Sequence, residues 1–356
     1  MENQKEEIEW ISKAKGFAIL GIVAVHAVAR FNIGGIISNT AAQGMYCVQL
    51  FFVISAYLTF RSLDKNCSEK WTSKKYIHYI LHKASRLLPV CAVMVLWQFI
   101  IYACSIGEIP DIKNSIYRKA FLAITFLNGF SYDFINPWGN WYLGILIQFL
   151  ALSPLLHRLI DTPKKSAYFF ILTTLTGYFS TMILNKFGID TSWYFYFWLP
   201  RQLPVLSIGI MLHVFQKQYS SEEKQNALKL LIFAISFFFL LSLFTRTPME
   251  THVQYGLLLT SFSYILFNNK YKIFGWLKLL GENSYGIYLY HLCFLFMYDS
   301  IAETKPRSER IFDFLAFYAI LLVLSLLLSK LTNLILEKPF FKFINHFLTS
   351  PCKKSS

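Results

Sequence analysis

The sequence predicts an all-α membrane protein, a bundle of about ten transmembrane helices with both termini in the cytoplasm. Composition, apolar segments of spanning length and the placement of basic residues together predict this fold class. Of the 356 residues, 55% are hydrophobic and 18% aromatic, whereas only 15% are charged. That balance excludes an ordinary water-soluble domain, which carries more charged residues and fewer apolar ones.

The candidate spanning helices are apolar segments separated by polar loops. They lie near residues 13–31, 43–61, 87–106, 139–160, 166–184, 194–215, 228–244, 252–268, 283–300 and 311–336. An apolar run of about 20 residues crosses the hydrocarbon core as a helix. The run at 120–130 is too short to cross, so we expect a re-entrant or surface helix there. Ser55 and Ala56 are small enough to let the second segment pack closely against a neighbour, and Pro154 is expected to kink the fourth.

Lysine and arginine gather in alternate loops of this arrangement. The basic loops are 61–86, 157–165, 217–229, 270–278 and the C-terminal tail. By the positive-inside rule these loops face the cytoplasm, and both termini lie on the same side. The formal net charge of +14 therefore indicates an anionic membrane leaflet as the partner of the basic residues, and no nucleic acid is expected. We expect one integral-membrane domain over residues 1–356, with no repeat and no separate soluble domain.

The sequence offers little evidence for a metal site or a processed leader. The six cysteines are scattered, with neither a CxxC pair nor zinc-ligand spacing, so no metal is expected. The acidic start lacks the basic region of a cleavable signal peptide. Histidines 78, 82, 157, 213, 252 and 346 lie near loops or span ends and carry little functional signal.

A histidine within the first apolar segment is the most informative single residue. An ionisable side chain at membrane depth is costly, and it usually faces the protein interior and serves a function. Lys15 precedes His26 by eleven positions, which places both side chains on one helix face about 16 Å apart along the axis. A snorkelling lysine and a hydrogen-bonded histidine would explain the pair structurally, so this spacing leaves both interpretations open.

Other polar residues form similar patterns in later segments. Lys83 and Arg86 are neighbours on a helix at a predicted cytoplasmic mouth, where two cations suit a phosphate-bearing ligand or simply anchor the helix. A second intramembrane histidine shares a helix face with two other polar side chains, and Asn140 lies in a predicted aromatic belt at the outer surface. The residues of that face are Ser284, Tyr288 and His291.

These patterns, taken in order, resemble the membrane-bound acyltransferase-3 family of bacterial cell-surface glycan O-acyltransferases. Lys15 and His26 resemble the family's Arg/Lys-x10-His signature. The further similar segments are Phe51 to Leu58, Lys83-x-x-Arg86 ending at Pro89, Trp141-x-Leu143 with Gln148-Phe149 and Pro154, Ser284-Tyr285 through His291, and Glu337-x-Pro339. The likeness spans about residues 8–342. It departs where Ala56 replaces glycine, where Leu146 replaces a frequent glutamate, and where lysine replaces the first arginine of two motifs.

The resemblance implies an enzyme in the inner membrane of a bacterium that moves an acyl group, most commonly acetyl, from cytoplasmic acyl-CoA to a sugar or polysaccharide hydroxyl. Lys15, Lys83 and Arg86 would bind the phosphates of the donor, and the thioester would reach His26. His26 would act as the general base or would take the acyl group covalently, and both roles stay open. Lining the same cavity, the substrate-positioning residues would be Ser284, Tyr288, His291 and Asn140.

A transporter or exporter of glycans or amphiphiles is the alternative function. It would also have many spans and intramembrane histidines. No half-to-half repeat is evident, and the cations at the predicted inner mouth favour a phosphate-bearing donor. The acceptor, the acyl chain and the oligomeric state are not predicted by the sequence.

Overall fold

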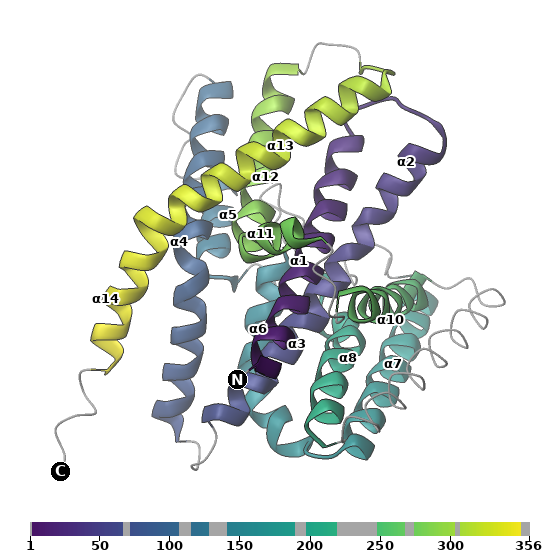
Figure 1. The fold of residues 1–356 in the computed structure, drawn as a ribbon, viewed down its shortest axis with the longest axis vertical. Coiled ribbons are helices and arrows are strands. Elements are labelled where there is room, and N and C mark those ends of the chain that lie inside the picture. The colour runs from purple at the N-terminus through teal and green to yellow at the C-terminus, as the bar shows by residue number, and fades with distance from the viewer. Residues whose placement is uncertain are drawn as a thin grey trace. The chain divides into compact units, whose positions relative to one another are not determined.

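A computed structural model provides the fold (Figure 1). It describes residues 2–66, 72–106, 115–127, 141–188, 197–218, 248–267, 274–302 and 307–349. Every regular element in these ranges is helical, which confirms the all-α prediction for the described part of the chain.

The helices follow one another along the chain with short connections. They are α1 Glu2–Val28, α2 Gly35–Ala42, η1 Gln43–Tyr46, α3 Cys47–Asn66, α4 Ser73–Ile106, α5 Ser115–Ile124, α6 Trp141–Leu159, α7 Pro163–Lys186, α8 Leu199–Gln218, α10 Pro248–Phe267, α11 Gly275–Glu282, α12 Ser284–Ala302, α13 Ile311–Thr332, the π-helix η5 Asn333–Glu337, and α14 Lys338–Thr349. The last three form one uninterrupted helical stretch.

Within the described residues, 6 stretches are long and apolar enough to cross a membrane. They are Glu9–Val28, Gly35–Asp64, Lys75–Ser105, Trp141–Leu159, Pro163–Lys186 and Ile311–Ile344. The predicted spans at 194–215, 252–268 and 283–300 coincide with α8, α10 and α12, which are helical but more polar. The predicted span at 228–244 lies outside the described residues. Several membrane-spanning helices are thus supported, while the total of about ten stays a prediction.

Two helices differ clearly from the sequence-based boundaries. α4 begins at Ser73 rather than near residue 87, because a lysine- and histidine-rich stretch continues the apolar helix without a break. Hydropathy detects only the apolar part of such a helix. The short run predicted near 120–130 corresponds to α5, which ends at Ile124.

The chain divides into two compact units, and each combines separate parts of the sequence. The first unit comprises Met1–Ala18, Met45–Glu69 and Gln148–Glu282, and the second comprises Ile19–Gly44, Lys70–Ile147 and Asn283–Ser356. The prediction of one domain is a statement about the whole chain, and it stays a prediction.

Small residues allow close helix contacts within each unit. In the first unit a Cβ on Gly209 would lie 2.1 Å from the carbonyl oxygen of Val53 and 2.9 Å from Cβ of Ala56, so α8 and α3 pack backbone to backbone. In the second unit a Cβ on Gly286 would lie 2.1 Å from Oγ of Ser329, which brings α12 equally close to α13. The expected packing role of Ala56 agrees with this arrangement.

Candidate active site

Two imidazoles from different helices meet in the second unit. His26 lies in the last turn of α1, and His291 lies on α12. Their ring centroids are 5.3 Å apart, with an angle of 42° between the ring planes. The His26 side chain is half-buried, whereas His291 is fully buried. The structure therefore brings together the two histidines that the sequence placed in separate apolar segments.

The hydrogen bonding of His291 determines which of its nitrogens can act. Its Nδ1 lies 3.0 Å from the carbonyl oxygen of Ile287. A carbonyl only accepts, so Nδ1 carries the proton and the neutral ring presents a lone pair at Nε2. No residue in the described part of the chain hydrogen-bonds this Nε2. A buried acceptor in that state suits a ligand that brings its own donor, such as a hydroxyl group.

Tyrosines line the His291 side of this pair. The ring of Tyr288 lies 6.0 Å from that of His291 and 5.8 Å from that of Tyr142 on α6. Ser284 is buried in the first turn of α12, about two helical turns before His291. Tyr288 thus contacts His291 directly, and Ser284 lies farther along the helix. Asn140 lies outside the described residues.

The predicted phosphate-binding cations of the second unit lie one turn apart on α4. Lys83 is half-buried with its Nζ 5.7 Å from the centre of the Tyr79 ring, and Arg86 is exposed. The Arg86 guanidinium stacks on Phe341 of α14, 4.4 Å from the ring centre. Stacking occupies a face of the guanidinium and leaves its N–H edge available for an anion.

The region around Arg86 is also joined to the helix that carries His291. The hydroxyl of Tyr285 on α12 donates to the carbonyl oxygen of Leu87, the residue after Arg86. α4 and α12 are therefore connected next to the two cations.

Lys15 belongs to the first unit and has different surroundings. A Cβ on Gly16 would lie 2.0 Å from the carbonyl oxygen of Leu277, and one on Gly281 would lie 1.6 Å from that of Ser12, so α11 packs closely on α1 beside Lys15. The Glu282 carboxylate, at the end of α11, acts electrostatically on the Lys15 ammonium. Lys15 and His26 do share the uninterrupted helix α1, which is the geometry that their spacing predicted. A joint phosphate site of Lys15, Lys83 and Arg86 stays a prediction.

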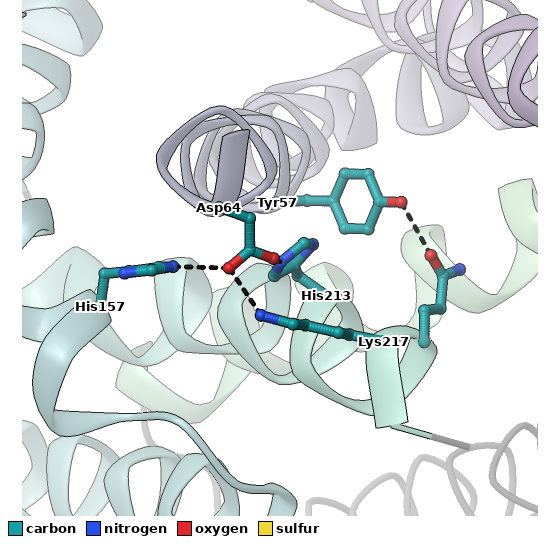
Figure 2. A network of polar contacts seen from close by, with 6 residues as sticks. Tyr57, Asp64, His157, His213 and Lys217 are labelled. Atoms are coloured by element: carbon teal, nitrogen blue, oxygen red, sulfur yellow. Dashed lines mark hydrogen bonds and ion pairs between the residues drawn. The ribbon is translucent and has the colours of Figure 1, made fainter. Parts of the chain in front are cut away.

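A polar cluster that sequence reasoning missed lies in the first unit (Figure 2). Asp64 of α3 accepts hydrogen bonds from Nε2 of His157 at 2.9 Å, Nε2 of His213 at 2.8 Å and Nζ of Lys217 at 2.7 Å. We call these four residues the Asp64 cluster. Each member lies toward the C-terminal end of its helix, where cationic groups are favoured by the helix dipole. The described residues contain no group of three or more histidine, cysteine or acidic side chains placed to hold a metal.

The Asp64 cluster ties together the ends of α3, α6 and α8. Phe60 packs edge-on against His157 and His213, with ring centroids 5.4 Å and 6.4 Å away. Nearby, the Tyr57 hydroxyl donates to Oε1 of Gln216 at 2.7 Å. The sequence signal was an acid at the end of one apolar segment and histidines at the ends of two others. Which ends would meet depends on packing, and the sequence alone does not show that.

We expect Asp64→Ala to destabilise the first unit by about 2 kcal/mol, because three donors, two of them on largely buried imidazoles, would lose their common acceptor. Thermal unfolding of the detergent-solubilised protein, followed by loss of the monodisperse peak, measures the effect. Asp161→Ala is the matched control, since the Asp161–Lys165 pair is exposed and lies within one helical turn. Equal melting temperatures for the two variants would show that the cluster contributes no stability.

Comparisons with known proteins agree on one family. The profile of the acyltransferase-3 family, described as "Acyltransferase domain", matches residues 8–333. The chain is 24% identical to the "Putative acetyltransferase ORF330" of Acidianus two-tailed virus, over 81% of this chain and 84% of that protein. It is 25% identical to the "O-acetyltransferase OatA" of Staphylococcus aureus (strain MRSA252), over 96% of this chain.

The chain spans 58% of the length of that OatA protein. No solved structure matches the chain. The family profile covers both compact units and includes the α1 and α12 histidines. The chain is therefore a member of the acyltransferase-3 family, an enzyme that transfers acyl groups other than aminoacyl groups.

Proposed function

We propose that this protein is a membrane O-acyltransferase that moves an acetyl group from cytoplasmic acetyl-CoA to a hydroxyl of a cell-surface or periplasmic sugar or polysaccharide. The observation that carries the proposal is the contact of His26 with His291 inside a chain of this family. The printed names of the relatives, which refer to acetyl and O-acetyl transfer, support the choice of group. In this proposal the protein is a multi-pass protein of a bacterial inner membrane, with about ten spans and both termini in the cytoplasm.

His26 acts as the general base in the transfer. Its imidazole takes the proton of the acceptor hydroxyl while the oxygen attacks the thioester carbonyl. The new C–O bond forms, the C–S bond breaks, and the CoA thiolate recovers the proton from the imidazolium. No proton is gained or lost overall, so the reaction needs no further acid or base.

His291 positions the acceptor beside His26. Its Nε2 accepts a hydrogen bond, and its Nδ1–H is held by Ile287, so the ring cannot turn without losing that bond. A hydroxyl that donates to Nε2 is held next to the His26 ring. Tyr288, packed against His291, and the buried Ser284 complete this wall of the site, and Asn140 is assigned to the same acceptor side.

Lys83 and Arg86 bind phosphates of the donor, together with Lys15. CoA carries its phosphates at one end and its thioester at the end of a long flexible arm. Cations at the cytoplasmic ends of helices can therefore hold the nucleotide while the thioester reaches deeper into the protein. The preorganised guanidinium of Arg86 on Phe341 supports this assignment.

Labelled donor in oriented membranes tests the proposal against the transporter alternative. Inside-out vesicles that contain the protein and its acceptor glycan are supplied with acetyl-CoA labelled in the acetyl group. We expect label on the glycan, in an amount that depends on the protein. Movement of unmodified glycan or amphiphile across the membrane, without label transfer, would contradict the proposal and support a transporter.

The same vesicles separate the two chemical roles of His26. A general base never carries the acyl group, so labelled donor without acceptor should leave the protein unlabelled. Stable label on a His26-containing peptide would instead show a covalent acyl-histidine.

A further inference from the structure

An arginine just beyond α1 makes three polar contacts around the candidate catalytic histidine. Arg30 Nε lies 3.0 Å from Oδ1 of Asp299, and its Nη2 lies 2.5 Å from Oδ2, which is a two-pronged ion pair with α12. Its Nη1 donates to the backbone carbonyl of His26 at 3.0 Å. One guanidinium therefore contacts both the residue that bears the proposed base and the helix that bears His291.

The carbonyl that Arg30 contacts belongs to the last turn of α1. The final carbonyls of a helix lack ordinary partners, and a cation there is also favoured by the helix dipole. The backbone N–H of Arg30 donates to Ala27 O at 3.1 Å, and that of Phe31 donates to Val28 O at 3.0 Å, so the chain turns tightly away at this point. The Arg30 side chain thus folds back and caps the turn that holds the His26 ring.

The ion pair and the imidazole pair connect the same two helices at successive levels. Asp299 follows His291 by about 12 Å along α12, and Arg30 follows His26 by about 6 Å. The long arginine side chain spans the difference. Because the order of contacts is the same along both segments, the ion pair sets the register in which His26 faces His291.

Neighbouring contacts hold the rest of this segment. The Asn32 backbone N–H donates to Ser308 O at 2.9 Å, and its Nδ2 donates to Oε1 of Glu309 at 3.1 Å. The Tyr318 hydroxyl of α13 donates to Leu20 O at 3.0 Å, a little more than one turn before His26. Arg30 is distinct among these residues in touching the backbone of His26 itself.

We infer that Arg30, fixed by Asp299, is a positioning residue that holds His26 in its reactive orientation toward His291. The inference rests on the proposed function of His26 and extends it to a residue outside the motifs that the sequence analysis identified. The Arg30 and Asp299 side chains are 25% and 44% exposed, so the pair is built at the edge of the site rather than in a closed core.

Steady-state kinetics of Arg30→Ala in detergent or vesicles test the inference. Small displacements of a catalytic group lower the rate steeply, so we expect kcat per folded molecule to fall by at least on the order of tenfold. The KM values for donor and acceptor should change little, since Arg30 binds neither in this account. A raised acceptor KM with an unchanged kcat would overturn the inference and make Arg30 a substrate-binding residue. An unchanged kcat with unchanged KM values would overturn it as well.

The charge exchange R30D/D299R separates positioning from simple stabilisation. The exchanged pair can restore the ion pair between the two segments, but an aspartate at position 30 cannot donate to the His26 carbonyl. We therefore expect melting temperature and membrane level to recover while kcat stays low. Full recovery of kcat would show that the ion pair alone matters and would overturn the positioning role. Lys165→Ala, which breaks an exposed ion pair on α7, is the control and should leave kcat unchanged.

A chemical readout makes the test independent of acyl transfer. Diethyl pyrocarbonate modifies accessible imidazoles, and peptide mass spectrometry measures the rate at each histidine. Arg30→Ala should speed modification of His26 while leaving the exposed His78 at its wild-type rate. If the wild type transfers no acyl group, the proposed function fails, but this readout still decides whether Arg30 holds His26. Equal His26 rates in variant and wild type would contradict the inference.

Discussion

His26→Ala is expected to abolish acetyl transfer, with kcat lower by about 10²–10⁴ and normal insertion into the membrane. The reason is that the variant lacks the group that takes the proton from the attacking hydroxyl. His26 lies in the last turn of α1 and contributes little to the buried core, so the fold should persist. The acetyl content of the surface glycan, together with label transfer per folded molecule in vesicles, measures the loss.

Two further variants make this result specific. His26→Gln keeps a side chain that hydrogen-bonds but cannot accept a proton at this pH, so it should be as inactive as alanine. His78→Ala removes an exposed histidine of α4 and should behave as wild type. Full activity of His26→Ala would discard the general-base mechanism and the covalent alternative together, because both act through this ring.

Arg86→Ala is expected to raise the KM for acetyl-CoA by roughly tenfold while leaving the acceptor KM unchanged. A charge-assisted hydrogen bond from guanidinium to phosphate contributes about 1.5–3 kcal/mol, and it acts on the donor alone. Initial rates with either substrate varied at saturating concentrations of the other give the two constants separately. Lys164→Ala removes one exposed positive charge from a predicted cytoplasmic loop and controls for a general electrostatic effect.

The outcome of this experiment also tests the role of Phe341. Arg86→Lys keeps the charge but loses the planar group that stacks on Phe341, so it should restore only part of the donor affinity. An unchanged donor KM in Arg86→Ala would remove Arg86 from the phosphate site. An acceptor KM that rises instead would place Arg86 on the other substrate.

The helical class was predictable because it follows from composition and local patterns. An apolar segment of sufficient length has few alternatives to a helix, since backbone groups must be satisfied internally in lipid. The boundaries were less accurate where apolar and polar stretches share one helix. α4 starts at Ser73 because its lysines and histidines extend the helix beyond the apolar part that hydropathy detects.

The candidate site was only partly predictable, because its contacts join distant parts of the sequence. Each of His26 and His291 was notable alone, yet their proximity depends on how α1 and α12 pack. The contacts of Arg30 were not predictable for the same reason. A single arginine after an apolar segment usually marks a membrane boundary, and its partners became evident only in three dimensions.

The Asp64 cluster shows the same limit in the first unit. Its histidines lie at helix ends, where the sequence gave no reason to choose between solvent and a partner. The carboxylate that collects them is on a third helix. Ion pairs of this kind depend on the meeting of helix ends, which no periodicity encodes.

The most direct test of the central claim is an experimental structure of the protein bound to a thioether analogue of acetyl-CoA. Electron cryo-microscopy of the complex would locate both ends of the donor. The account predicts the phosphates at Lys15, Lys83 and Arg86, and the reactive end of the analogue about 3–3.5 Å from the His26 ring. A His26 ring that faces lipid, or donor density with no open path from the basic residues to that ring, would contradict it.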